Sequence, residues 1–184
     1  MKVKPREVIL KNRKLVTLRS ATSGDAENLL HHLTVTHTES YKNLNQTAAF
    51  WKNFSISDEE KILMEFETSK NKFMLVAEFD GRIVGGLGFV GHQAEFLRRT
   101  ANIGMSIQKE FCNSGLGTAM MSYMLELGRE FGFHRVELTV RTYNLPGIKL
   151  YEKSGFRRVG LLKDTALIDG QYVDEFSYQI ILGE

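Results

Sequence analysis

The segment from Cys112 to Thr118 combines two glycines with the start of an amphipathic helix, so its backbone could bind a phosphate. A helix N-terminus exposes unpaired N–H groups and the positive end of the helix dipole. Glycine has no Cβ, which lets an anion approach the backbone closely. Neither a Walker-type loop nor a full dinucleotide-binding fingerprint is present, and a Gly-x-Gly turn alone also fits a tight connection. The candidate phosphate ligands are Cys112, Asn113, Ser114, Gly115, Leu116, Gly117 and Thr118.

A second segment, residues 138–156, contains the side chains best suited to hydrogen bonding and proton transfer. It predicts a strand, then Asn144, then a short helix that carries Tyr151. Asn144 fits a helix N-cap, and Tyr151 on an amphipathic helix fits a core aromatic. A phenol with a pKa near 10 can also protonate a leaving thiolate of similar basicity, so a catalytic role stays open.

Together the two segments resemble the GNAT superfamily of acetyl-CoA-dependent N-acyltransferases. The family's pattern Gln/Arg-x-x-Gly-x-Gly/Ala fits residues 112–117 except at Cys112, and its pattern Asn…Leu-Tyr-x-Lys-x-Gly-Phe fits residues 144–156 almost throughout. Residues 169–175 resemble the Asp-Gly-x-Tyr-x-Asp hairpin of the ribosomal-protein and polyamine acetyltransferase branch. The resemblance covers roughly residues 15–182.

This resemblance implies an N-acetyltransferase that moves an acetyl group from acetyl-CoA, as co-substrate, directly to a primary amine. It implies that the turn at 112–118 holds the pyrophosphate and that Asn144 hydrogen-bonds the cofactor arm. Tyr151 would be the general acid that protonates the departing thiolate. The backbone of three strand residues would pair with the pantetheine amides: Met105, Ser106 and Ile107.

The general base is the point at which this sequence departs from the family. Many relatives carry a glutamate near the position of Asn102, and an amide cannot accept the proton. Glu95 is a candidate substitute, although a solvated loop charge is the slightly better explanation of this residue, and proton loss through ordered water is a further option. The departure also leaves an alternative function open, a catalytically silent acyl-CoA-binding sensor or partner module.

Other nucleophiles and metal ligands find little support in the sequence. A thiol at a helix start can have a lowered pKa, but no histidine stands at a recognisable spacing to activate Cys112. Three histidines lie on one early helix without a matched cysteine or carboxylate pattern: His31, His32 and His37. We therefore expect no metal.

The amine acceptor, a small molecule or a peptide, should bind where the pattern is least regular: residues 36–54, 91–97 and 164–174. Candidates for an apolar wall are Tyr41, Trp51, Phe54 and Phe96, which fit a core equally well. Acidic candidates for attracting a cationic amine are Glu39, Glu95, Asp169 and Asp174.

The bulk properties fit one domain at residues 15–184 after a lead-in or extra strand at 1–14. The chain has 184 residues, 42% of them hydrophobic and 25% charged, with a formal net charge of +2. No basic run favours nucleic acid, and no apolar run indicates a bilayer span or a signal peptide. The single cysteine suits a reducing cytoplasm. Relatives in this branch often pair, so a homodimer is one option.

The hydrophobic patterns predict an α+β fold of the GNAT kind. We expect a mixed, mostly antiparallel central sheet with helices on both faces and a V-shaped splay between the middle strands. The expected strands are 15–19, 73–79, 82–90, 98–108, 135–140, 156–162 and 174–182. The expected helices are 26–37, 58–69, 117–131 and 145–153.

Overall fold

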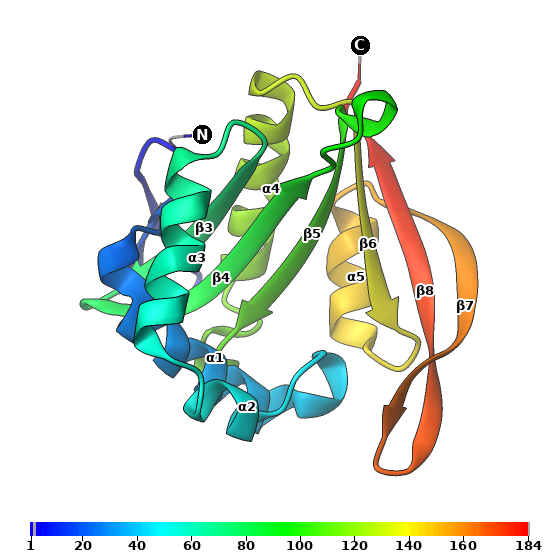
Figure 1. Cartoon of the computed structure of the whole chain (residues 1–184), viewed down its shortest axis with the longest axis horizontal. Helices are drawn as coiled ribbons and strands as arrows, with labels where there is room; N and C mark the ends of the chain where they lie inside the picture. The colour runs from blue at the N-terminus through cyan, green and yellow to red at the C-terminus, as the bar shows by residue number, and fades with distance from the viewer. Residues whose placement is uncertain (2, 184) are drawn as a thin grey trace.

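The computed structural model describes Met1 and residues 3–183, and its framework is one eight-stranded sheet (Figure 1). The strands follow one another across the sheet in the order β1-β2-β3-β4-β5-β6-β8-β7. Only β5 and β6 run parallel, and all other neighbours are antiparallel. The strands are β1 (Arg6–Ile9), β2 (Leu15–Ser20), β3 (Lys72–Phe79), β4 (Arg82–Gly91), β5 (Thr100–Ile107), β6 (Arg135–Arg141), β7 (Arg157–Ile168) and β8 (Gln171–Ile181).

Helices cover both faces of this sheet. The front face in Figure 1 carries α1, α2 and α3, and α4 and α5 lie behind the strands. The helices are α1 (Ala26–Ser40), α2 (Ala48–Lys52), α3 (Ile56–Thr68), α4 (Leu116–Glu130) and α5 (Leu145–Lys153). Among the described residues, no helix is long and apolar enough to cross a membrane.

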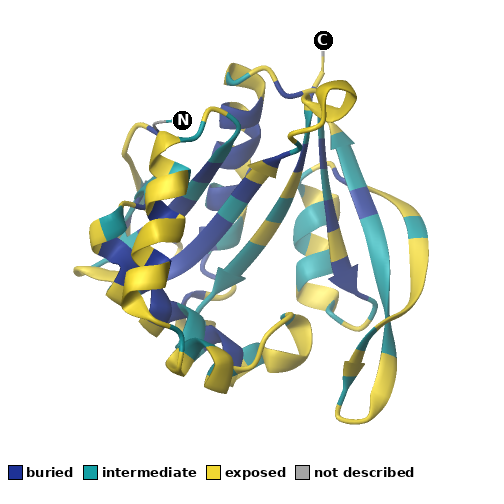
Figure 2. Ribbon diagram, viewed as in Figure 1, coloured by how far each residue is buried: buried dark blue, intermediate teal, exposed yellow. Residues whose placement is uncertain are grey.

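The buried core lies mainly between the sheet and α4, as the dark blue of these elements in Figure 2 shows. The inner face of α4 contributes fully buried side chains such as Leu116, Met120 and Met124. A smaller cluster on the front face packs Leu29 of α1 and Leu63 of α3 against the sheet. The larger cluster includes Ala101 of β5 and Val136 of β6, so close packing fixes the position of both middle strands.

The middle strands β5 and β6 pair over a very short length and then separate. Their register covers only residues 100–102 against residues 135–137. Beyond Asn102, β5 keeps its hydrogen bonds to β4, and β6 keeps those to β8. The facing edges of β5 and β6 are therefore unpaired, which confirms the expected splay within a mostly antiparallel sheet.

Several element boundaries differ from the expectations. Residues 6–9 form β1, so the extra strand is the correct alternative for part of the N-terminal segment. The helix α2 forms within the segment 36–54, which the sequence marked as irregular. Helix α3 begins at Ile56, two residues before the expected start, because Ser55 is its N-cap. The last hairpin is longer than expected, since β7 continues past a register shift at residues 162–166.

Candidate active site

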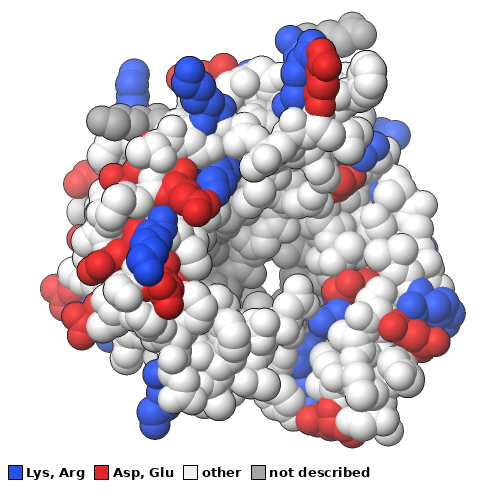
Figure 3. Space-filling view, viewed as in Figure 1, with Lys and Arg blue, Asp and Glu red and all other residues white. Residues whose placement is uncertain are grey.

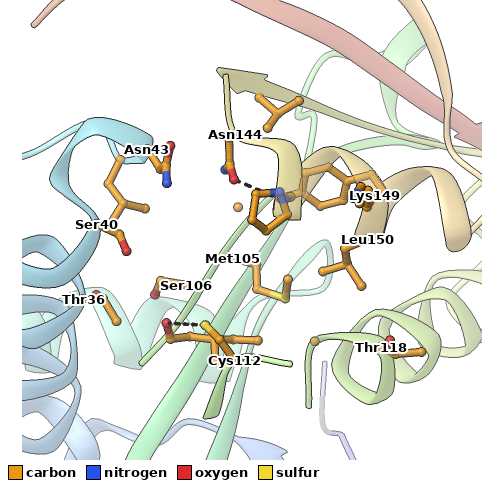
Figure 4. Close-up of a pocket in the computed structure, with 18 of the residues that line it drawn as sticks. Thr36, Ser40, Asn43, Met105, Ser106, Cys112, Thr118, Asn144, Lys149 and Leu150 are labelled. Carbon is orange, nitrogen blue, oxygen red and sulfur yellow. Dashed lines mark hydrogen bonds between the residues drawn. The ribbon is translucent and has the colours of Figure 1, made fainter. Parts of the chain in front are cut away.

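A cavity of about 650 Å³ opens in the gap between β5 and β6. Its walls come from β5, the turn before α4, the end of β6, α5 and the segment after α1. Figure 4 shows residues of these five elements converging on the space, among them Met105, Thr118 and Asn144. In the space-filling view the front face is hollowed at this place, and most of the atoms in the hollow are uncharged (Figure 3).

The turn before α4 presents its backbone to one end of the cavity. Gly115 caps the helix with φ of 95°, a left-handed conformation that favours glycine. At Gly117 a Cβ would lie 3.1 Å from Leu150 of α5 and 3.3 Å from Ile107 of β5, so only glycine fits without a shift. The first N–H groups of α4 face a concave surface, which suits an anionic group.

All but two residues of the predicted phosphate turn line the cavity. Ser114 is buried and donates its hydroxyl to the Phe111 carbonyl, so its side chain stabilises the turn. Leu116 is buried in the core beneath α4. The cavity-lining members are Cys112, Asn113, Gly115, Gly117 and Thr118.

The β5 residues predicted to pair with a pantetheine arm form the floor of the cavity. Residues 103–107 all line it, and their edge towards β6 carries no strand partner. Free N–H and C=O groups along an extended edge can pair with an extended amide chain as a strand would. Met105 and Ser106 are labelled beside the open space in Figure 4. Figure 1 shows the same gap between the two ribbons.

Asn144 and Tyr151 reach the cavity from the β6–α5 unit. Asn144 is the N-cap of α5, and its Oδ1 accepts a hydrogen bond from the Gly147 N–H at 3.1 Å. Tyr151 packs against Phe156 and Tyr178, with ring centroids 6.1 and 6.5 Å away. Its hydroxyl has no hydrogen-bond partner among the described residues, and burial raises its pKa to about 12. The phenol is therefore protonated at neutral pH, and it is a weaker acid than an ordinary tyrosine.

The residues expected to form an acceptor wall lie outside the cavity lining. Trp51 and Phe54 pack with Phe50 in edge-on and tilted ring contacts against α1, and Phe96 is 98% exposed. Tyr41 donates its hydroxyl to Asp169 at 2.9 Å. The wall on this side is mostly polar instead, formed by Thr36, Ser40, Asn43 and Asn45 together with Leu44.

The four acidic candidates are also held in other contacts. Glu39 accepts from the Lys109 N–H, and Asp169 pairs with Lys42 at 3.0 Å. Asp174 pairs with Lys163 at 2.7 Å. Glu95 lies in a short turn that precedes β5, and its side chain is 80% exposed. Its Oε1 is 3.7 Å from the Arg98 Nη1. The acidic residue that lines the cavity is Glu175.

A buried ion pair that the sequence did not reveal lies behind this wall. Arg141 at the end of β6 is buried, and its Nη1 lies 2.6 Å from Glu175 on β8. Its Nη2 donates to the Asn45 Oδ1 at 2.8 Å. Arg141 therefore joins β6 to the segment after α1 across the front of the gap.

Cationic residues around the end of the cavity where the glycine turn lies were also not predicted from the sequence. Lys11 lies beside Gly115 and lines the cavity, together with Lys149 and Lys153 of α5. Lys149 and Lys153 are four residues apart, so helical spacing places them on one face. That spacing was readable in the sequence, but the approach of Lys11 from the N-terminal segment was not.

The surroundings of the Cys112 thiol and of the histidines differ from those of a nucleophile or a metal site. Burial and the nearby Glu39 raise the pKa of Cys112. The lowered pKa that a thiol at a helix start can have is therefore not found here. His37 accepts from the Trp51 indole N–H at 3.0 Å, and His32 contacts the Ser106 hydroxyl at 2.9 Å. No group of three or more metal-ligating side chains occurs among the described residues.

Comparison with known proteins agrees with this geometry. The model of the acetyltransferase (GNAT) family matches residues 33–156, and the chain belongs to this family. It is 37% identical over 103 residues to the L-amino acid N-acetyltransferase AaaT of Escherichia coli. That match covers 55% of this chain and 64% of the relative's length.

Solved structures share the fold over nearly the whole chain. A ribosomal-protein-alanine N-acetyltransferase from Brucella melitensis is 22% identical with a TM-score of 0.77, over 89% of this chain and 98% of its own. The acetyltransferase yncA from Salmonella typhimurium, solved with its cofactor acetyl-CoA, is 20% identical with a TM-score of 0.75. That alignment covers 92% of this chain and 95% of yncA. At sequence identities of 20–22%, the similarity to these structures shows a shared fold.

Proposed function

We propose that this protein is an N-acetyltransferase that moves the acetyl group of acetyl-CoA directly to a primary amine. The observation that carries the proposal is the unpaired edge of β5 at residues 103–107. This edge runs from the anion-binding turn before α4 to the closed end of the gap, where β5 meets β6. An extended pantetheine chain could follow it and present its thioester inside the cavity.

The phosphate end of the cavity supports acetyl-CoA as the donor. The left-handed Gly115 and the close packing at Gly117 leave a bare backbone cradle at the start of α4. Lys11, Lys149 and Lys153 surround the same opening and supply positive charge. Backbone donors and lysines together suit a pyrophosphate, since each favours a negative group at short range.

Tyr151 supplies the proton in this proposal. The acceptor nitrogen forms a bond to the acetyl carbon, the carbon–sulfur bond breaks, and the sulfur leaves as a thiolate. Tyr151 gives its hydroxyl proton to that sulfur, and a proton from the acylated nitrogen returns to the phenol through solvent. A pKa of about 12 keeps the phenol protonated before each turnover, so the acid is available throughout the neutral range.

The acceptor is a small or peptide amine that enters from the front face. The wall there is polar and largely uncharged, which suits an acceptor with hydrogen-bonding groups around its amine. The relative AaaT is named for L-amino acids, so amino acids are the first acceptors to test. We also propose that the protein works in the cytoplasm, where acetyl-CoA is available, and a homodimer is an option that sedimentation can test.

The test is release of CoA thiol from acetyl-CoA by purified protein, followed with a thiol-reactive dye. The acceptor panel contains L-amino acids, peptides with free N-termini, polyamines and amino sugars. Thiol release above the no-acceptor rate, together with acetylated product by mass spectrometry, supports the transferase. Separate assays of each acceptor then identify the class.

Titration calorimetry with acetyl-CoA distinguishes the alternative function. Binding without transfer to any acceptor would favour a sensor or partner module, because the donor site would work without chemistry. Absence of binding would contradict the donor site itself. In that case the β5 edge and the α4 turn would need another ligand.

A further inference from the structure

Three polar side chains meet on the front face at the closed end of the gap. His92 follows β4, Asn102 lies on β5 and Glu137 lies on β6. The Asn102 Nδ2 is 3.1 Å from the His92 Nε2, and the Glu137 Oε1 is 3.4 Å from the same ring nitrogen. Glu137 is held in turn by Arg135, whose Nη2 lies 2.6 Å from its Oε2.

The position of this cluster relative to the cavity follows from the strand register. Asn102 pairs with Glu137 at the last rung that joins β5 to β6. The next front-facing residues are Gly104 on β5 and Thr139 on β6, and both line the cavity. Two residues along a strand span about 7 Å, so the cluster borders the cavity at the end where the proposed thioester would lie.

Two groups face the His92 Nε2, the Asn102 amide nitrogen and the Glu137 carboxylate oxygen. In the tautomer that carries its proton on Nδ1, Nε2 has a lone pair that accepts from the Asn102 N–H and can take a proton. The Glu137 carboxylate beside that nitrogen would stabilise the imidazolium that forms when Nε2 takes a proton. The side chains of His92 and Glu137 are 32% and 27% exposed, so an acceptor or a water molecule can reach them.

On the basis of the proposed transferase, we infer that His92 is the general base that deprotonates the acceptor amine, with Glu137 as its positioning residue. The carboxylate that relatives carry near Asn102 is thereby replaced by the imidazole of His92, just after β4, together with a glutamate from β6. Imidazole is well suited to accept a proton near neutral pH.

The protons balance with one base and one acid. The acceptor ammonium gives one proton to the His92 Nε2 and becomes the nucleophile. After the carbon–nitrogen bond forms and the carbon–sulfur bond breaks, Tyr151 protonates the sulfur. The second nitrogen proton returns to Tyr151, and the imidazolium releases its proton to solvent.

The first variant is His92→Gln, with His31→Gln as its matched control. His31 is exposed on α1, outside the cavity lining. We expect His92→Gln to lower kcat at pH 7 about 100-fold or more, and His31→Gln to keep the wild-type rate. The KM for acetyl-CoA should stay within about twofold in both, because the donor cradle is untouched.

The pH profile separates a base from a structural residue. Protonated imidazole cannot accept a proton, so the wild-type kcat should fall on the acid side, and this limb should disappear in His92→Gln. Glu137→Gln should lower kcat and keep the limb, because the imidazole is still present but loses the carboxylate beside its Nε2. Exposed Glu130→Gln on α4 is the control for the second variant and should keep the wild-type kcat.

An acceptor whose amine is already neutral at pH 7, such as a hydrazine, gives an independent readout. With this acceptor, the decrease in kcat caused by His92→Gln should be at least tenfold smaller, because no ammonium has to be deprotonated. Equal losses with both acceptors and an unchanged acid limb would overturn the assignment. An acid limb abolished by Glu137→Gln but kept in His92→Gln would make Glu137 the base instead.

The same measurements keep this inference apart from the proposed function. If the wild type transfers acetyl groups and the His92 and Glu137 variants are equally active, His92 is not the base, and the proposed transferase function stands. A wild type that transfers no acetyl group to any amine overturns both. Glu95→Gln, assayed in parallel, tests the exposed glutamate that the sequence suggested for the same role.

Discussion

At the scale of single residues, burial determines which groups near the cavity can carry charge. Desolvation raises the pKa of the Tyr151 phenol and lowers that of the His32 imidazole to about 4. Both side chains are therefore neutral at pH 7, although they lie on opposite faces of the sheet. In the proposed mechanism the neutral phenol is the proton donor, whereas the neutral His32 imidazole avoids the cost of burying a charge.

Replacing Tyr151 with phenylalanine removes the hydroxyl and keeps the packing against Phe156 and Tyr178. We expect Tyr151→Phe to lower kcat about 100-fold or more, with acetyl-CoA affinity within about twofold of wild type. Steady-state kinetics and calorimetry measure the two effects. An unchanged kcat would remove Tyr151 from the mechanism.

The stability of the protein should fall in mild acid because His32 is buried without charge. The unfolded chain binds this proton below about pH 6.5, and the folded chain binds it only near pH 4. Stability is therefore lost as the pH falls through this window, by about 2 kcal/mol at pH 5 from His32 alone. Urea unfolding at pH 7.5 and pH 5 measures the loss.

Two substitutions isolate this contribution from other titrating groups. His32→Gln cannot take up the proton, so its stability should fall about 2 kcal/mol less between the two pH values than that of the wild type. His31→Gln should show the full wild-type loss, because His31 is exposed in the folded state. Equal losses in all three proteins would contradict the role of His32.

At the scale of elements, the start of α4 is the proposed binding site for the pyrophosphate of the donor, and its geometry depends on one left-handed glycine. Gly115 has φ of 95°, and a Cβ there would meet only the Lys11 side chain at 3.8 Å or more. Gly115→Ala therefore introduces backbone strain rather than a clash, at a cost of about 1 kcal/mol or more. We expect the strained turn to weaken acetyl-CoA binding about tenfold in calorimetry.

The other end of the same helix provides the matched control. Gly132 follows α4 with φ of 77°, and nothing lies within 4 Å of an added Cβ. Gly132→Ala should lower stability by a similar amount and leave acetyl-CoA affinity unchanged, because it is remote from the cradle. Equal losses of affinity in both variants would show that the effect comes from general destabilisation.

At the scale of the whole molecule, the gap divides the sheet into two parts with a short joint. Three residues on each strand pair β5 with β6, and side chains add contacts across the front. Asn45 accepts from Arg141, and Tyr41 donates to Asp169 at the tip of the last hairpin. These contacts hold the segment after α1 against the β6–β8 part, so they define the mouth of the cavity.

Arg141 is the member of this set whose loss should matter most for stability. Its substitution by methionine leaves Glu175 without a counter-ion in a largely buried place. Arg141→Met should destabilise the fold by about 3–5 kcal/mol, measured by urea unfolding. The double variant Arg141→Met/Glu175→Gln should regain part of that loss, and a strictly additive result would contradict a buried coupled pair.

The local sequence was sufficient to predict most strands and helices, and family motifs named the site residues that lie close in sequence. The glycines before α4 and the Asn144–Tyr151 segment lie at the cavity as expected. Element ends were less predictable: α3 was expected from residue 58, yet it begins at Ile56 with Ser55 as its N-cap. Ser55 makes no side-chain capping hydrogen bond, so the true start of the helix has no strong local signal in the sequence.

The sequence by itself determined the elements, the turn that can bind an anion and the phenol on α5, because each depends on neighbours within a few positions. Only the tertiary structure decided that Lys11 reaches that turn, that Asn45 meets Arg141 and that His92 meets Glu137. These partners are between 45 and 104 residues apart in the chain. Strand order and register bring them together, and they follow from burial of apolar faces over the whole sheet rather than from any local pattern.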